Sequence, residues 1–215
     1  MTDRLTKYRK QFLEDWFDFN GAGMFFIICM TYIALLFVKR IFIIDSIAAF
    51  EVLNERGDIW VFDILYGIQY LSVPIFLAWK WSWTTLTLWI GCFMFGYRVH
   101  FNQLWKMVML AEIVFFLPEI VKVLWFTLFY TDPDYNDYMA FYPFSLINLV
   151  DYTQIAPKWH YPLKSINIFE VLYWPVLVLG IYFLSGKKLK YSAYIVLSTY
   201  VLFFFVWLAF YLAVY

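Results

Sequence analysis

The sequence has few of the residues from which metal centres and catalytic sites are built. It contains two cysteines and two histidines among 215 residues. Cys29 and Cys92 fall inside hydrophobic segments, so we interpret them as small buried apolar residues, and no metal-ligand spacing is present. His-Glu-x-x-His, Gly-x-Ser-x-Gly and a glycine-rich phosphate loop are also absent. We therefore expect no metal, no cofactor and no catalytic activity.

The sequence has no excess of charge of either sign. Its formal net charge is zero, which removes the electrostatic argument for a nucleic-acid partner. Hydrophobic residues make up 64% of the chain and aromatic residues 25%. A soluble core of this size has no room for so much aromatic surface, whereas a bilayer does. We expect an integral membrane protein that inserts through its own spans, without a cleavable signal peptide.

Hydrophobic runs predict an all-α, polytopic transmembrane bundle of five or six spans, because one span needs about 20 apolar residues. We treat residues 21–215 as a single transmembrane domain. The expected spans are 21–38, 59–79, 84–97, 104–129, 166–184 and 191–215. A polar-aromatic connector, residues 130–164, separates the fourth span from the fifth.

Residues 1–20 are expected to form an amphipathic helix at the membrane interface. Apolar residues recur there at spacings of three and four, which places them on one helix face. One interpretation is that this helix lies among the lipid headgroups. The other is that it docks a partner protein through Phe12, Trp16 and Phe19.

The side of the membrane on which the chain starts is left open by the sequence. The basic turn at 186–190 favours the cytoplasm under the positive-inside rule. Six spans then place the N-terminus outside, although it carries Arg4, Lys7, Arg9 and Lys10. Either the acidic residues of the same segment outweigh these N-terminal positive charges, or one apolar segment does not cross the membrane.

Charged residues inside the fourth span are the strongest functional signal. Glu112, Glu119 and Lys122 lie among apolar residues, and a charge at the bilayer centre costs about 2.5–3.5 kcal/mol on insertion scales. Glu119 and Lys122 are three residues apart, close enough to pair on one helix. Pro118 removes a backbone donor and leaves the carbonyl near Val114 without its usual partner, so we expect a kink in the helix there.

Three interpretations of this polar site stay open. The first is structural: Glu119 pairs with Lys122, and Glu112 bonds to Tyr, Trp or Asn side chains of adjacent helices. The second is a proton or cation route, in which Asp63 and Glu170 take part. The third is a contact with another subunit or a lipid headgroup. For Asp63 and Glu170, a position at helix ends near headgroup level is favoured over burial.

The C-terminal half carries a recognisable pattern. It contains the segment 141–146, the prolines Pro157 and Pro162, the run Asn167-Ile168-Phe169-Glu170, then Gly180 and the Lys187-Lys188 turn. Over residues 104–215 this resembles the Yip family of small polytopic membrane proteins, in its uncharacterised bacterial form. The resemblance implies a bundle of about five spans without a catalytic centre, and eukaryotic relatives that recruit partner proteins. It supplies no active residue.

The sequence thus predicts a non-catalytic membrane scaffold or accessory subunit that packs with membrane lipids and with another membrane protein or a second copy of the chain. The expected location is the inner membrane of a bacterium. The alternative is a small permease or a proton- or cation-coupled transporter that uses the intramembrane carboxylates.

Overall fold

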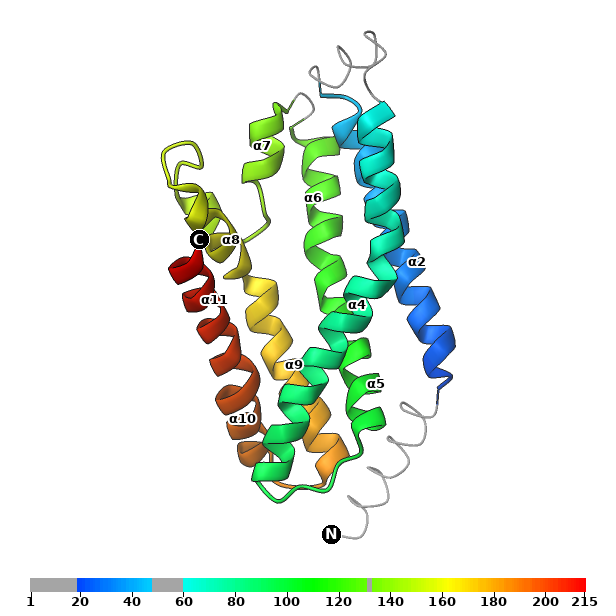
Figure 1. Ribbon diagram of the computed structural model, residues 1–215, viewed down its shortest axis with the longest axis vertical. Helices are drawn as coiled ribbons and strands as arrows, with labels where there is room; N and C mark the ends of the chain where they lie inside the picture. The colour runs from blue at the N-terminus through cyan, green and yellow to red at the C-terminus, as the bar shows by residue number, and fades with distance from the viewer. Residues whose placement is uncertain (1–18, 48–59, 131–132) are drawn as a thin grey trace. The chain divides into compact units, whose positions relative to one another are not determined.

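The computed structural model describes residues 19–47, 60–130 and 133–215, and these residues form helices joined by turns (Figure 1). Among them, four helices are long and apolar enough to cross a membrane, namely Gly21–Ile44, Trp60–Met94, Ile168–Ser185 and Leu189–Val214. The predicted all-helical fold with multiple candidate spans is therefore confirmed for the described residues.

The chain divides into two compact units. Of the described residues, the first unit takes 19–27, 78–114 and 171–215. The second unit takes 28–47, 60–77, 115–130 and 133–170. The expectation of a single transmembrane domain over 21–215 stays a prediction.

The first candidate span matches its predicted position. It consists of α2 (Gly21–Lys39) and a π-helical turn, η1 (Arg40–Ile44). Asn20 precedes α2, and its side-chain oxygen accepts the N–H of Ala22 at 3.2 Å, which satisfies one free donor of the first turn. Residues 1–18 of the helix predicted at 1–20, with Phe12 and Trp16, lie outside the described residues.

One prediction is wrong between residues 59 and 97. The spans expected at 59–79 and 84–97 are a single 35-residue helix, α4 (Trp60–Met94). No glycine or proline occurs between Pro74, which lies inside this helix, and Gly91, so the backbone has no reason to break at Lys80. The helix ends instead at Gly96, whose φ of 72° is left-handed, and the N–H of Tyr97 bonds to the carbonyl of Cys92 at 2.8 Å.

The predicted fourth span is a broken helical run. It consists of α5 (Phe101–Ala111), a 3₁₀ segment η2 (Glu112–Phe115) and α6 (Phe116–Leu128). The 3₁₀ segment ends three residues before Pro118, which lies in the first turn of α6, and the expected kink at Pro118 stays a prediction. The 3₁₀ segment starts at Glu112, the first of the two carboxylates.

The connector holds only short helices. These are α7 (Tyr135–Ala140), η3 (Leu146–Leu149), η4 (Pro157–Trp159) and α8 (His160–Ser165). Asp134 and Asp137 form a capping box at the start of α7. Residues 144–146 pair with 166–168 through a bridge between Ser145 and Asn167, which ties the connector to the start of the next span.

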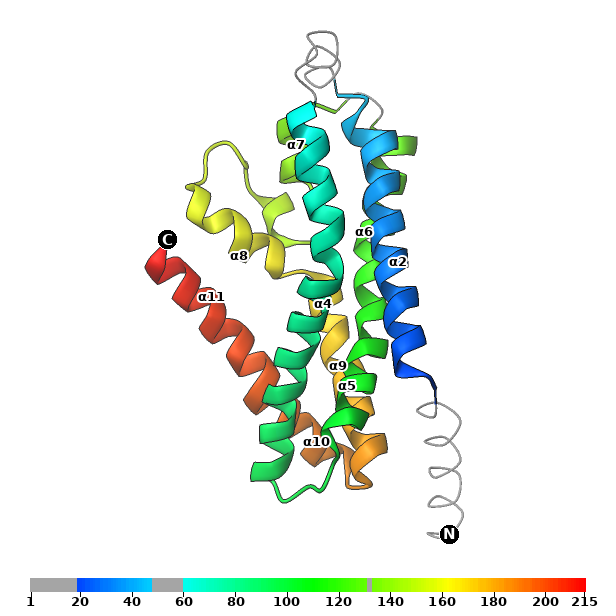
Figure 2. The ribbon, with the colours of Figure 1, turned by 45° about the vertical axis from the view of Figure 1, so that its right-hand side comes forward.

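The last two candidate spans also match their predicted positions. The first is α9 (Ile168–Ser185), and the second comprises α10 (Leu189–Val196), a π-helical turn η5 (Leu197–Val201) and α11 (Leu202–Val214). Figure 2 shows α10 and α11 as one continuing run after the turn at Gly186, which has a φ of 76°. Large apolar side chains remain exposed along these helices, as expected for a surface that faces lipid or other helices.

Candidate functional site

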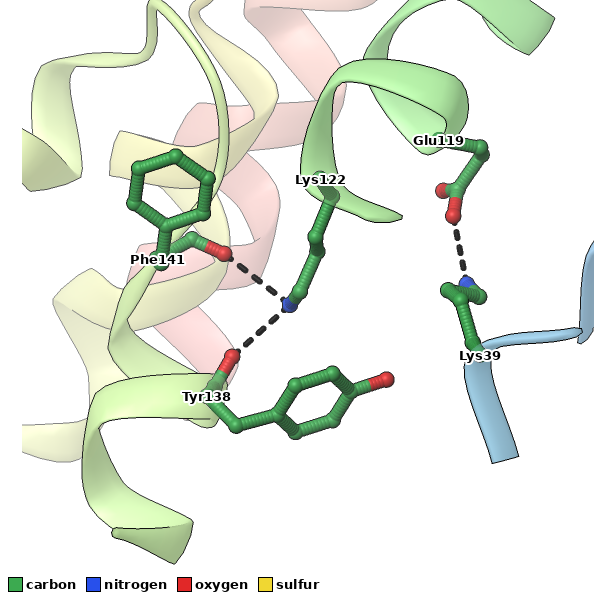
Figure 3. A network of polar contacts seen from close by, with 5 residues as sticks. All are labelled: Lys39, Glu119, Lys122, Tyr138 and Phe141. Atoms are coloured by element: carbon green, nitrogen blue, oxygen red, sulfur yellow. Dashed lines mark hydrogen bonds and ion pairs between the residues drawn. The ribbon is translucent and has the colours of Figure 1, made fainter. Parts of the chain in front are cut away.

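Within the second unit, Glu119 on α6 forms an ion pair with Lys39, the last residue of α2 (Figure 3). The Glu119 side chain is 21% exposed and that of Lys39 11%, so both charges are largely removed from solvent. The helices that carry them also touch at Tyr32 and Phe116, whose rings are 4.8 Å apart. The pair thus joins α2 to α6.

The predicted pairing of Glu119 with Lys122 is wrong. Although the two residues are one helical turn apart, Lys122 points toward the connector, as Figure 3 shows. Its Nζ donates to the carbonyls of Tyr138 at 2.7 Å and Phe141 at 3.0 Å. Carbonyls at the end of a helix lack intrahelical donors, so α7 offers Lys122 acceptors that a helix neighbour does not.

A second lysine reaches the same helix end. Nζ of Lys164, on α8, donates to the carbonyl of Met139. Burial lowers the pKa of Lys164 from its usual value, because the charged form loses hydration. Two ammonium groups from separate helices therefore hold the C-terminal turn of α7.

Asp63 occupies an open position, as predicted. Its side chain is 50% exposed and pairs with Arg40, which follows α2 directly. The Arg40 guanidinium also lies 4.6 Å from the centroid of the Tyr66 ring. This contact joins the end of the first span to the start of α4.

Glu170 is more buried than the sequence predicted. It lies in the first turn of α9, as expected, but it is buried. Its backbone N–H bonds to the side-chain oxygen of Asn167 at 2.9 Å, so Asn167 caps the helix. The bridge between Ser145 and Asn167 ties the connector to the chain directly before this helix start.

Within the first unit, Glu112 is fully excluded from solvent and pairs with Lys80 of α4. Nζ of Lys80 lies 2.7 Å from Oε1 of Glu112. Because the partner is a lysine, the expectation of a neutral Tyr, Trp or Asn partner is wrong. The ring of Trp81, the residue after Lys80, packs with those of Phe25 and Trp105, and the three centroids are 5.6–6.2 Å apart.

Phe19 contacts its own chain. Its carbonyl accepts a hydrogen bond from Nζ of Lys106 at 2.8 Å, and the same ammonium lies 4.9 Å from the centroid of its ring. Docking of a partner through this residue stays a prediction.

The structure thus distributes the predicted site residues over separate places. Glu119 and Lys122 lie near each other without pairing, Asp63 lies in the same unit on α4, and Glu112 belongs to the other unit. The cations that neutralise the carboxylates were missed in the sequence. These cations are Lys39, Arg40 and Lys80, which directly follow the spans expected at 21–38 and 59–79. For Lys80 the available signal was a lysine between two tryptophans inside an apolar run.

The fold therefore defines a class, the multi-pass integral membrane proteins, through its four candidate transmembrane helices. No protein-family model, curated protein or solved structure matches the chain. The resemblance to the Yip family stays a prediction.

Proposed function

We propose that the chain is a non-catalytic membrane scaffold or accessory subunit that packs with lipids and with other membrane proteins or a second copy of itself. The observation that carries this proposal is the pairing of charges between helices. Glu112, Glu119 and Asp63 each contact a cation from another helical segment of the same unit. Such pairs offset the cost of charge in an apolar setting and fix which helices pack together.

The transporter alternative receives less support from the same contacts. A carboxylate that carries protons or cations must exchange with water during each cycle. Glu112 is 0% exposed and held by Lys80, and Glu119 is held by Lys39. Separating Glu112 from Lys80 leaves a carboxylate uncompensated where no solvent reaches it, and separating Glu119 from Lys39 leaves a largely buried lysine without this counter-charge.

We further propose five spans, with the helical run 101–128 as the third. Since α4 is one helix, the count falls by one from six. With the turn at 186–188 in the cytoplasm, five spans place the N-terminus there too. The basic segments at 4–10, 98–106 and 186–190 then share the cytoplasmic side, and the acidic connector lies outside, as the positive-inside rule favours. The membrane we propose is the inner membrane of a bacterium.

Native mass spectrometry after extraction in mild detergent tests the scaffold proposal. We expect the 26.0 kDa chain to appear at fixed stoichiometry with a second protein or with further copies of itself. Chemical cross-linking in intact membranes before extraction controls for dissociation by detergent. A monomer in both preparations would contradict the proposal.

A further inference from the structure

One end of the first unit carries basic side chains that have no acidic partner. They are Arg98, in the link between α4 and α5, and Lys187, Lys188 and Lys190, at the turn between α9 and α10. All four residues are exposed, and within the described residues none of their side chains forms an ion pair. The Lys190 ammonium lies 5.6 Å from the centroid of the Tyr194 ring. These charges are therefore accessible to a partner outside the chain.

The two basic segments lie at the same end of the first unit. Figures 1 and 2 both show the link after α4 and the turn after α9 at the lower end of the view. Tyr97, the residue before Arg98, has Tyr191 of α10 as an electrostatic neighbour. A Cβ built at Gly91 would lie 3.0 Å from Cγ2 of Ile195, so the end of α4 packs on α10. The four cations thus belong to one surface, which we call the basic end.

Acidic residues do not balance the basic end. Glu112 is the one acidic residue among the described residues of the first unit, and Lys80 neutralises it. Residues 1–18 contain four basic and four acidic side chains, so they add no net charge. The other acidic side chains outside the described ranges belong to residues 48–59, before α4, and 131–132, after α6. A whole helical run separates each of these segments from Arg98, so the basic end keeps its positive excess.

The basic end lies where helices meet the membrane surface. The candidate spans Ile168–Ser185 and Leu189–Val214 flank the turn at 186–188, and Trp60–Met94 ends four residues before Arg98. Tyr191 and Tyr194, which follow the turn, are exposed, and tyrosine is enriched at the depth of lipid headgroups. Lysine and arginine side chains at the ends of spans extend toward the same depth.

From this placement we infer that the basic end binds the headgroups of anionic lipids, of which phosphatidylglycerol is the example we test. Clusters of about four to eight Lys and Arg residues directly beside a span attract anionic headgroups, and the attraction falls off within a Debye length. Phosphatidylcholine has the same phosphate, but its choline group cancels the charge. The inference rests on the chain crossing the membrane, and on neither the scaffold role nor the number of spans.

Electron spin resonance of spin-labelled lipids tests this inference on the full chain in phosphatidylcholine bilayers. A trace of labelled phosphatidylglycerol or phosphatidylcholine is added, and the motionally restricted fraction of each label gives its relative association with the protein. Both leaflets have the same composition, so the direction of insertion does not affect the result.

The test variant removes all four charges of the basic end and is Arg98→Gln/Lys187→Gln/Lys188→Gln/Lys190→Gln. The matched control keeps every charge and is Arg98→Lys/Lys187→Arg/Lys188→Arg/Lys190→Arg. A second control, Lys158→Gln, removes an exposed lysine outside the first unit.

We expect the wild type to prefer phosphatidylglycerol to phosphatidylcholine by about twofold or more at low salt. The Gln variant should lose most of this preference, and so should the wild type at about 1 M salt, where the Debye length falls to about 3 Å. Both controls should keep it. An equal preference in the Gln variant and the wild type would overturn the inference. So would the absence of a preference in the wild type or its loss in the charge-conserving control.

Discussion

Glu112 is fully buried in the first unit, and Lys80, 32 residues earlier in the chain, supplies the cation beside it. The two partners differ in environment, since 31% of the Lys80 side chain is exposed and none of the Glu112 side chain is. Removing the lysine therefore leaves a charge that water cannot reach, whereas removing the carboxylate leaves a lysine that can reach water. Because of this difference in exposure, substitution of Lys80 and substitution of Glu112 should destabilise the protein by different amounts.

We expect Lys80→Met to destabilise the protein by about 3–5 kcal/mol, because it strands the Glu112 carboxylate. Glu112→Gln should cost less, and the double variant should be close to Glu112→Gln alone, since no stranded charge remains in it. Unfolding by sodium dodecyl sulfate, followed by circular dichroism, measures the three differences.

Lys187→Met is the control for loss of a lysine at an exposed position. If the effects of Lys80→Met and Glu112→Gln simply add, the pair does not couple, and a structural role for it is contradicted.

At the scale of helices, α4 differs most from what the sequence predicted, because it is one helix where two spans were expected. With 35 residues it is about 52 Å long, well beyond the hydrocarbon core of a bilayer at about 30 Å. Its C-terminal part packs closely on the last span within the first unit. A Cβ built at Gly91 would lie 2.5 Å from Cγ2 of Thr199 and 3.0 Å from Cγ2 of Ile195. Glycine is required here because a side chain has no room.

Gly91→Ala should destabilise the protein by about 1–3 kcal/mol, since Thr199 and Ile195 are β-branched and have few other rotamers to adopt. Gly67→Ala, in the same helix, is the matched control. A Cβ at Gly67 meets nothing within 4 Å, so this change should be neutral or stabilise by about 0.5–1 kcal/mol. Thermal unfolding in detergent compares the Gly91 and Gly67 variants. Equal Tm values for the two would contradict the close packing of Gly91 against Thr199 and Ile195.

At the scale of the whole molecule, apolar runs were sufficient to predict most helices. The spans expected at 21–38, 166–184 and 191–215 correspond to α2, α9 and the run from α10 to α11, because long apolar segments leave few alternatives to a membrane helix. The break expected near Lys80 was wrong because a lysine marks a span end only when no partner neutralises it. Glu112 is that partner.

The ion pairs between helices could not be predicted from local sequence patterns. Lys39 and Glu119 are 80 residues apart, and nothing in the sequence near either one specifies the other. The favourable spacing of Glu119 and Lys122 on one helix was misleading, because the carbonyls of α7 compete for Lys122. Such competition becomes visible only when the connector is folded against α6.

The number of spans tests the account most directly, and labelling of single cysteines in intact cells measures it. The native Cys29 and Cys92 are buried and give little background. With five spans, a membrane-impermeant maleimide should label Asp151→Cys and Tyr215→Cys in intact cells. Thr2→Cys and Lys187→Cys should be labelled only after lysis. Labelling of Thr2→Cys in intact cells, with Lys187→Cys still protected, would place the two ends of the chain on the same side and contradict the five-span architecture.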